Sequence, residues 1–534
     1  MPCPLRARPS AHGSARLAAG ACTAIATLLF AVSLAGQPSA AYYAATAELI
    51  ARGRQALAVC NGVFVSGRTL EQIYAGELRA DGGEPVPPGS VTIDRQRRAV
   101  AVGVAVSKAS VPVMRAAYRE GVGCIVMAPH QTFADIDSLP ELRLTPPSGD
   151  ASTIAWPDGD LLPNAPFPTD VRRPVLEQAG NWAFDRTAHG GHAGQVTLSL
   201  LVVHRGRLLY ERYGPGVDMR TRTRTWSTAK SIASTLVGIA TAQGLLELDA
   251  PLPFDWPPNE LAELGTRVKS RSPMIGVRDW PPPNDERAAD PRRRITLRHV
   301  LNMSSGLYPV DNEYANVHGS GLSYFGGWSS AQNARDRGLV REPGTVWDYE
   351  NNDPLLAILA LRTALKDRRA YLEFPRRALF DRIGMRNTVA GVDRFGDFVM
   401  SSQIYTNARD LARFGLLYLN RGAWNGQRIL PETWVDFVRS PAPSTARFGN
   451  FYGGQFWLVP DTRTDLPQDA YTTAGAQGQF TIIVPSYELV VVRRGLDSAG
   501  PSFSVWDLLG EVLKAFPAAK GGSKPVAQSA AETR

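Results

Sequence analysis

The fold is decided by the stretch Thr225-Trp226-Ser227-Thr228-Ala229-Lys230, which continues as Ser231-Ile232-Ala233-Ser234-Thr235-Leu236-Val237-Gly238-Ile239-Ala240. From Ser227 onward the spacing predicts a helix with one apolar face, made by Ile232, Leu236, Val237 and Ala240. Gly244 is the expected end of this helix.

Ser227 and Lys230 are three residues apart, so on a helix their side chains share a face and can meet. A serine hydroxyl becomes a good nucleophile when a neighbouring base takes its proton, and a lysine in an apolar pocket can be that base. Ser-x-x-Lys occurs once in the chain, and only seven of its 58 basic residues are lysines. The alternative interpretation is a serine that caps the helix beside a solvated lysine.

The length of 534 residues leaves room for more than one domain. The net charge is +8, but Arg6, Arg8 and Arg16 lie in the first forty residues, which contain no acid. The remaining charge of about +5 is dispersed, which argues against a nucleic-acid partner.

The N-terminus has the features of an export signal over residues 1–40. Its basic start is followed by an apolar run over 17–36 and by the small-residue site Pro38-Ser39-Ala40. We therefore expect a periplasmic or secreted protein. If the signal is left uncleaved, residues 17–36 are just long enough to anchor the chain in a membrane.

Four cysteines are present, and Cys3 and Cys22 would leave with the signal. The remaining pair, Cys60 and Cys124, is expected to form a disulfide in an exported protein, and two buried free thiols are the alternative. No cluster of Cys and His has the spacing of metal ligands, so we expect no metal site.

Residues 41–165 are predicted to form a small α+β N-terminal module without a chemical motif. Its expected elements are helices over 45–57 and 70–78, a short strand that runs into a turn over 63–68, and paired strands over 91–94 and 99–106. Thr69 and Gln72 predict a capping box at the second helix. Residues 140–170, rich in Pro, Ser, Asp and Gly, are expected to act as a linker.

Residues 166–520 are predicted to form one α/β domain. A hairpin over 196–211 and strands over 480–484 and 489–493 enclose helices predicted over 297–303, 354–365, 409–420 and 431–438, and a last helix follows over 505–516. Strands at both ends favour a single antiparallel sheet. Residues 251–294 read as a surface insertion, and residues 521–534 as a disordered tail.

A Ser/Lys pair usually needs a third group that passes protons to the leaving atom, often a tyrosine. Tyr-x-Asn occurs at Tyr314, Tyr349, Tyr405 and Tyr418, so its context has to decide. Tyr349 follows a Pro-Gly turn and precedes the apolar run over 355–360, which places it on a loop just before a buried helix. We therefore select Tyr349.

With these residues the chain resembles the serine hydrolases of the class C β-lactamase, DD-peptidase and esterase superfamily. It is most similar to the branch of the 6-aminohexanoate-dimer hydrolases, over roughly residues 195–516. Beyond the Ser227 block, the resemblance rests on blocks over 295–307, 343–351, 407–417 and 475–479.

The resemblance implies a β-lactamase/transpeptidase-like fold, in which helices flank an antiparallel sheet beside an all-helical subdomain, and it implies no cofactor. It assigns Ser227 as the acylated nucleophile, with Lys230 and Tyr349 as acid/base groups. The backbone N–H groups of Ser227 and Ala476 would form the oxyanion hole, with Ala476 on an edge strand. Asn351 would hold Lys230 or bind the substrate.

The chain departs from the superfamily at Thr473-Ala474-Gly475. β-Lactamases and DD-peptidases carry Lys-Thr-Gly or His-x-Gly there, and the basic residue helps to receive a substrate carboxylate. We expect Thr473 and Gly475 to border the substrate, but without a cation. Arg493 and Arg494 could compensate, but at a strand end we expect them to be solvated.

The expected function is therefore that of an exported serine hydrolase acting on a small-molecule amide or ester. A DD-peptidase or β-lactamase of the cell wall is the first alternative, and a non-catalytic binding protein with the same fold is the second. Trp256, Trp280 and Trp328 are candidates for the pocket wall or for packing anchors. The sequence contains no signal for a particular oligomeric state.

Overall fold

The computed structural model describes residues 40–81, 85–103, 111–145, 147–256, 290–309, 319–498 and 500–517. The expected export signal, most of the insertion at 251–294, Tyr314, Trp280 and the tail at 521–534 lie outside these ranges. Within them, no helix is both long and apolar enough to cross a membrane.

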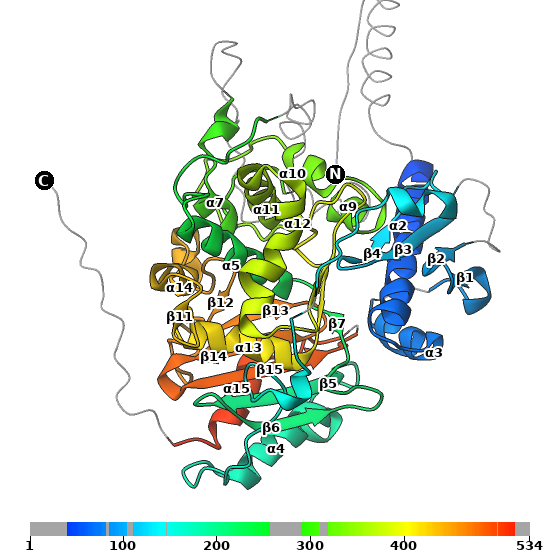
Figure 1. Cartoon of the computed structure of the whole chain (residues 1–534). Coiled ribbons are helices and arrows are strands. Elements are labelled where there is room, and N and C mark those ends of the chain that lie inside the picture. The colour runs from blue at the N-terminus through cyan, green and yellow to red at the C-terminus, as the bar shows by residue number, and fades with distance from the viewer. Residues whose placement is uncertain are drawn as a thin grey trace, which may run out of the picture.

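A six-stranded antiparallel sheet forms the centre of the molecule, in the order β12-β13-β14-β15-β5-β6 (Figure 1). Its strands are β5 (Thr197–His204), β6 (Arg207–Tyr213), β12 (Trp457–Leu458), β13 (Tyr471–Gly475), β14 (Gln479–Val484) and β15 (Leu489–Gly495). The predicted hairpin is β5–β6, and the predicted C-terminal strands are β14 and β15. Because β15 pairs with β5, the prediction of a single antiparallel sheet is confirmed.

Helices cover both faces of this sheet. On one face lie α4 (Arg173–Phe184) and α15 (Val505–Leu513), packed against inward residues such as Leu200, Val202, Ile482 and Val491. On the other face lie α5 (Thr228–Ala242) and α13 (Ala408–Leu419), packed against Leu201, Val203, Ile483 and Val490. Successive strand residues point to opposite faces, so strands that are covered on both sides are apolar throughout.

A helical region joins α5 to α13 and forms the upper part of the molecule in Figure 1. Its helices are α7 (Leu297–Leu301), α9 (Ser320–Phe325), α10 (Ser330–Arg335), α11 (Asn352–Leu365) and α12 (Arg368–Phe374), with α14 (Glu432–Arg439) after α13. Two small sheets border it, one in the order β7-β9-β8 and one formed by β10 and β11. Their strands are β7 (Thr223–Arg224), β8 (Val389–Ala390), β9 (Ile404–Thr406), β10 (Ala423–Trp424) and β11 (Gln427–Arg428).

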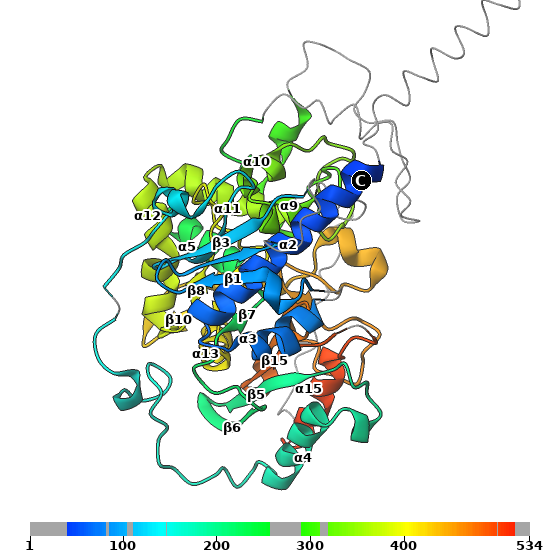
Figure 2. The same ribbon diagram turned by 90° about the vertical axis from the view of Figure 1, so that its right-hand side faces the viewer.

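The N-terminal residues form an antiparallel sheet in the order β1-β2-β3-β4, crossed by the long helix α2 (Ala40–Phe64) (Figure 2). The strands are β1 (Val91–Asp94), β2 (Ala99–Val102), β3 (Met114–Arg119) and β4 (Gly123–Val126). α2 packs against β2, β3 and β4 and also against α9 of the helical region. A Cβ added at Gly53 would lie 1.8 Å from the carbonyl oxygen of Phe325, so this glycine permits the close approach of α2 to α9.

The strand predicted over 63–68 is wrong, because α2 continues to Phe64 and a turn follows. Burial of this helix between its own sheet and α9 outweighs the strand preference of Val63, Phe64 and Val65. The predicted capping box is confirmed: Thr69 and Gln72 cap α3 (Leu70–Ile73), which runs into the π-helical turn η1 (Tyr74–Leu78).

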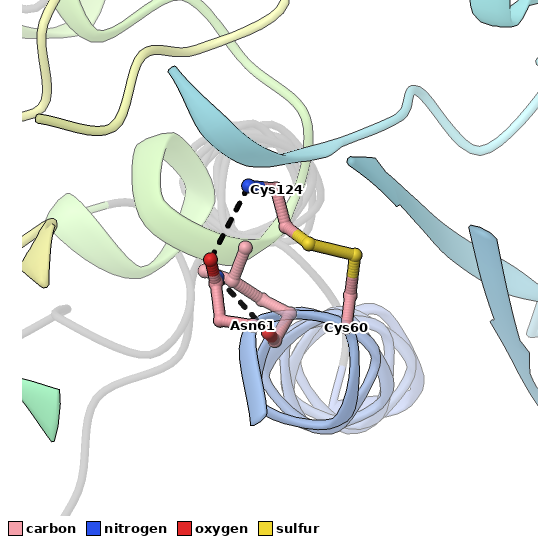
Figure 3. The surroundings of a disulfide bond; sticks show 4 residues. Cys60, Asn61 and Cys124 are labelled. Atoms are coloured by element: carbon pink, nitrogen blue, oxygen red, sulfur yellow. Dashed lines mark hydrogen bonds between the residues drawn. A yellow bond between two sulfur atoms is a disulfide. The ribbon is translucent and has the colours of Figure 1, made fainter. Parts of the chain in front are cut away.

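A disulfide joins Cys60 near the end of α2 to Cys124 on β4 (Figure 3). Next to it, the side chain of Asn61 accepts a hydrogen bond from the backbone N–H of Cys124 at 3.2 Å and donates one to the carbonyl oxygen of Leu57 at 3.1 Å. The disulfide and the side-chain amide of Asn61 therefore both join the end of α2 to β4.

Buried Arg413 is one of the side chains that hold the segment between the N-terminal sheet and α4 against the central domain. The guanidinium of Arg413 on α13 donates to the carbonyl oxygens of Pro157 and Gly159 and to the carboxylate of Asp160. The planar guanidinium presents its donors in a fixed fork that suits several acceptors at once.

We expect the Cys60→Ser/Cys124→Ser variant to unfold at a lower urea concentration than the oxidised protein, with a loss of about 2–4 kcal/mol. The disulfide closes a loop with a sequence separation of 64, and cross-links of that length chiefly restrict the unfolded chain. Circular dichroism during urea titration measures the midpoint. A reductant should lower the midpoint of the native protein and leave that of the double variant unchanged. Equal midpoints for the native protein and the double variant, both measured without reductant, would contradict the prediction.

Candidate active site

Ser227 stands at the N-terminus of α5, where the chain leaves β7. Trp226, just before it, has a φ of +49°, a left-handed conformation that turns the chain sharply into the helix. Ser227 itself is half-buried, whereas the residues of the first turn of α5 behind it are buried. As the residue that caps the helix, Ser227 also has a backbone N–H without an acceptor inside the helix.

The amine of Lys230 contacts the hydroxyl of Ser227. Its Nζ lies 2.9 Å from Ser227 Oγ, 2.6 Å from Asn351 Oδ1 and 3.0 Å from the carbonyl oxygen of Ser401. Lys230 is only 1% exposed, so these acceptors replace water around the amine. The alternative of a solvated lysine is therefore wrong.

These contacts suit the amine in both of its protonation states. The oxygens of Asn351 and Ser401 can only accept, so each takes one N–H of Lys230. A neutral amine then points its lone pair at the hydroxyl of Ser227, and an ammonium points its third N–H there. The Nδ2 of Asn351 donates to Ser320 Oγ at 3.1 Å, which turns the Oδ1 of the amide toward Lys230.

Tyr349 completes the cluster from the loop before α11. Its ring centroid lies 5.0 Å from Lys230 Nζ, and its hydroxyl interacts with the side chain of Ser227. Burial raises the pKa of Tyr349 to about 12, and the hydrogen bond with Ser227 opposes this shift. The phenol is therefore protonated in the neutral pH range.

The other tyrosines of the Tyr-x-Asn pattern lie elsewhere. Tyr405 is buried on β9. Tyr418 is buried inside α13, with its hydroxyl 2.7 Å from Thr235 Oγ1. The structure thus brings together Ser227, Lys230 and Tyr349, with Asn351 beside them.

Aromatic side chains that the sequence analysis did not select surround Tyr349. The centroid of Trp457 lies 5.5 Å from that of Tyr349, and further contacts join Trp347, Phe451 and Tyr452 into one aromatic cluster. Trp347, Phe451 and Trp457 are half-buried, so part of each residue is accessible to solvent. In the sequence, Trp347 stands two residues before Tyr349, and this spacing indicates an aromatic neighbour for that tyrosine.

The candidate tryptophans are placed differently. Trp256 is buried against Phe254 and under the guanidinium of Arg292, which makes it a packing anchor. Trp328 is 54% exposed. Neither belongs to the aromatic cluster around Tyr349.

The end of β13 lies against the first turn of α5. A Cβ added at Gly475 would lie 2.2 Å from the carbonyl oxygen of Thr225 and 3.1 Å from the backbone nitrogen of Thr228. Ala476 directly follows Gly475, so its backbone lies at the same end of α5 as Ser227. The expectation that Ala476 lies on an edge strand is wrong: it lies in the turn after β13, and β12 forms the edge of the sheet.

Thr473 links β13 to α5 through its side chain. The hydroxyl is fully buried, lies 3.2 Å from Thr228 Oγ1 and accepts the backbone N–H of Thr481 at 3.1 Å. Its role in substrate binding stays a prediction.

The two arginines of β15 are buried, so the expectation that they are solvated is wrong. Arg494 donates to the carbonyl oxygens of Thr223 and Thr406 and to the side chain of Gln479. Arg493 forms an ion pair with Asp497 and lies under the ring of Phe503. Strand residues near a sheet end are solvated only when no layer covers them, and here β7, β9 and the segment after β15 supply acceptors.

Within the described part of the chain, no group of three or more His, Cys, Asp or Glu side chains could hold a metal ion. The chemistry that the cluster offers is that of a hydroxyl, an amine and a phenol in mutual contact. Such an arrangement can move a proton away from a serine oxygen and return it to another atom.

Comparison with known proteins finds a family model that matches more than half of the chain. The family model described as Beta-lactamase matches residues 184–493. An uncharacterised protein from Alkalihalophilus pseudofirmus is 22% identical over 315 residues, which covers 55% of this chain and 82% of that protein.

Solved structures also resemble this chain. A Bacillus anthracis protein with the provisional name 6-aminohexanoate-dimer hydrolase is 20% identical, with a TM-score of 0.46, over 60% of this chain and 78% of that one. A D-stereospecific amidohydrolase from Streptomyces is 16% identical, with a TM-score of 0.43, over 65% of this chain and 99% of that one.

We expect Gly475→Ala to lower the melting temperature by several degrees, equivalent to about 1–3 kcal/mol. The new methyl group would meet backbone atoms of Thr225 and Thr228, which cannot move aside without shifting α5 or β13. Differential scanning fluorimetry measures the change. Gly89→Ala is the matched control, because nothing lies within 4 Å of its Cβ position and its φ is not positive; equal melting temperatures for the two variants would contradict the close approach.

Proposed function

The chain belongs to the beta-lactamase family, and from this premise we propose that it cleaves amides or esters through an acyl-enzyme formed on Ser227. The observation that supports this most is the distance of 2.9 Å between Lys230 Nζ and Ser227 Oγ, at a buried lysine that also donates to oxygens of Asn351 and Ser401. A covalent intermediate divides one difficult displacement into two easier ones.

In the acylation step, the neutral amine of Lys230 takes the proton of Ser227 while Oγ attacks the carbonyl carbon. The ammonium formed keeps its contacts with Asn351 and Ser401, so no reorganisation is needed. Tyr349 donates its phenolic proton to the leaving nitrogen or oxygen, and the bond to the leaving group breaks. The positive charge now on Lys230, beside the ring, stabilises the phenolate.

In the deacylation step, the phenolate of Tyr349 takes a proton from water, and the resulting hydroxide attacks the acyl carbon. Since burial raises the pKa of Tyr349 to about 12, its phenolate is a strong base for this task. The bond between Oγ and the acyl group then breaks, and Lys230 returns its proton to Ser227. All groups end in their starting protonation states.

The negative charge on the carbonyl oxygen needs donors in both steps. We assign this role to the backbone N–H groups of Ser227 and Ala476, which the close contact at Gly475 holds at the same end of α5. Backbone donors fixed in advance stabilise such an oxyanion without moving during the reaction, and removing one typically costs about a hundredfold or more in rate.

The surroundings favour an uncharged, apolar substrate over a carboxylate. Position 473 carries a threonine whose hydroxyl is used between β13 and α5. The cations of β15, Arg493 and Arg494, lie one strand further along the sheet and are bonded to other partners. The half-buried faces of Trp347 and Trp457 beside Tyr349 would instead contact an apolar acyl or leaving group.

The proposal is tested by incubating the protein with p-nitrophenyl butyrate, a linear aminohexanoate dimer and a penicillin, followed by intact-protein mass spectrometry. We expect turnover of the ester or amide. Ser227→Ala should lose it by about a thousandfold or more, because the nucleophile is absent. With p-nitrophenyl butyrate, whose leaving group departs without a proton, Tyr349→Phe should accumulate acyl-enzyme, because the base for deacylation is removed.

Glu120→Ala, an exposed acid far along the chain from these residues, is the control and should match the native protein. A long-lived adduct with penicillin alone would favour a cell-wall enzyme instead. Failure of a fluorophosphonate to label Ser227, together with no turnover, would favour a non-catalytic binding protein.

We further propose that the protein is exported. The support is the disulfide between Cys60 and Cys124, since such bonds persist in oxidising compartments, together with the signal-like sequence over residues 1–40. We expect the mature protein to begin after Ala40 and to be found outside the cytoplasm. N-terminal sequencing and cell fractionation measure this, and an intact N-terminus in the membrane fraction would indicate an uncleaved anchor instead.

A further inference from the structure

The side chain of Gln477 connects the two loops that carry the proposed oxyanion donors. Its Oε1 accepts a hydrogen bond from the indole Nε1 of Trp226 at 3.1 Å. Trp226 directly precedes Ser227, and Gln477 directly follows Ala476. One amide therefore ties together the backbone on both sides of the oxyanion hole.

The same amide is held from outside the central domain. The Nε2 of Gln477 donates to Oδ1 of Asp81 at 2.9 Å, and Asp81 follows the turn η1 in the N-terminal part of the chain. Asp81, Gln477 and Trp226 line one cavity between the two parts, together with Arg54, Glu77 and Arg224. The carboxylate thus fixes which end of the Gln477 amide faces Trp226.

Both residues joined by this amide have left-handed backbone conformations. Trp226 has a φ of +49° and Gln477 a φ of +61°, and neither is a glycine. Such conformations are sparsely populated and persist only when their surroundings hold them in place. The hydrogen bonds of Gln477 are part of those surroundings.

The N-terminal part also holds the strand that leads to Ser227. The hydroxyl of Ser66 donates to the carbonyl oxygen of Arg222, and the guanidinium of Arg222 donates to the carbonyl oxygen of Val65. The guanidinium of Arg224 lies 3.6 Å above the ring of Trp226 and donates to Ser402. The N-terminal part therefore contacts the approaches to both proposed donors.

We propose that Asp81 is a positioning residue, through which the N-terminal module sets the geometry of the oxyanion hole by way of Gln477 and Trp226. This inference rests on the proposed function, because it assigns a purpose to the backbone donors of Ser227 and Ala476. It gives the N-terminal module a part in the reaction through Asp81, which contacts Gln477 and not Ser227, Lys230 or Tyr349. Substrate binding through the aromatic cluster is independent of this link.

The test compares Asp81→Ala, Asp81→Asn, Gln477→Glu and the exchanged pair Asp81→Asn/Gln477→Glu, with p-nitrophenyl butyrate as the substrate. Asp81→Ala should lower kcat about tenfold to a hundredfold with KM within about twofold, because misplaced donors stabilise the transition state less. Asp81→Asn should retain activity, since its amide oxygen still accepts from Gln477. Gln477→Glu should lose activity, because two carboxylates then face each other.

The exchanged pair gives the sharpest result. The amide introduced at position 81 would donate to the carboxylate introduced at position 477, and that carboxylate would still accept from the indole of Trp226. The pair should therefore recover most of the kcat lost in Gln477→Glu. A merely structural role of Asp81 would not produce a loss confined to kcat and a recovery by exchange. Glu120→Ala, an exposed acid of the same module, is the matched control and should leave both constants unchanged.

A second measurement detects the hydrogen bond between Trp226 and Gln477 independently of enzymatic activity. The indole N–H resonance of Trp226, assigned with Trp226→Phe, should shift and exchange faster with solvent in Asp81→Ala and return in Asp81→Asn. Native kcat in Asp81→Ala, or an unchanged indole resonance, would overturn the inference. If the native protein neither hydrolyses the ester nor is labelled at Ser227, the proposed function fails, and the indole resonance alone decides whether Asp81 positions the loop.

Discussion

The rest of the structure depends on the burial of one amine, that of Lys230, which is removed from water. Removing a charge from water costs several kcal/mol unless partners replace the lost hydration. The partners of Lys230 come from three different places: the start of α5, the residue before α11, and the backbone at Ser401 before β9. The helical region and the sheet must therefore meet correctly before this side chain can be buried at all.

Local patterns predicted most of the secondary structure and the residues of the cluster. The spacing of Ser227 and Lys230, the apolar face of α5 and the loop position of Tyr349 are all properties of short stretches. What the sequence could not show depends on distant partners. The stretch from Val63 to Arg68 has strand-forming residues but lies at the end of a helix packed on two sides, and the contact of Gln477 with Asp81 joins residues that no local pattern relates.

The arginines illustrate the same limit. Arg493 and Arg494 stand at the end of a strand, where a charged side chain usually reaches water, but loops from elsewhere in the chain supply their acceptors. Arg413 likewise binds backbone carbonyls of a distant segment. A guanidinium keeps its charge and binds several oxygens in one plane, whereas an amine can give up its proton. The sparing use of lysine in this chain follows that division: arginine joins segments, and Lys230 lies where the proposed reaction moves a proton.

The order of strands in the central sheet determines when during synthesis this sheet can be completed. β5 cannot pair with β15 until β15 has been synthesised, almost three hundred residues later. The hydrogen bond between Asp81 and Gln477 spans 396 positions. Contacts so distant in sequence form slowly, because a long loop must close before they contribute. A nascent chain that has already made Ser227 and Lys230 still lacks β13, β14 and β15, so it holds the proposed nucleophile without the strand that leads to Ala476. On the proposed mechanism, the serine and its second oxyanion donor therefore come together only when the polypeptide is nearly finished.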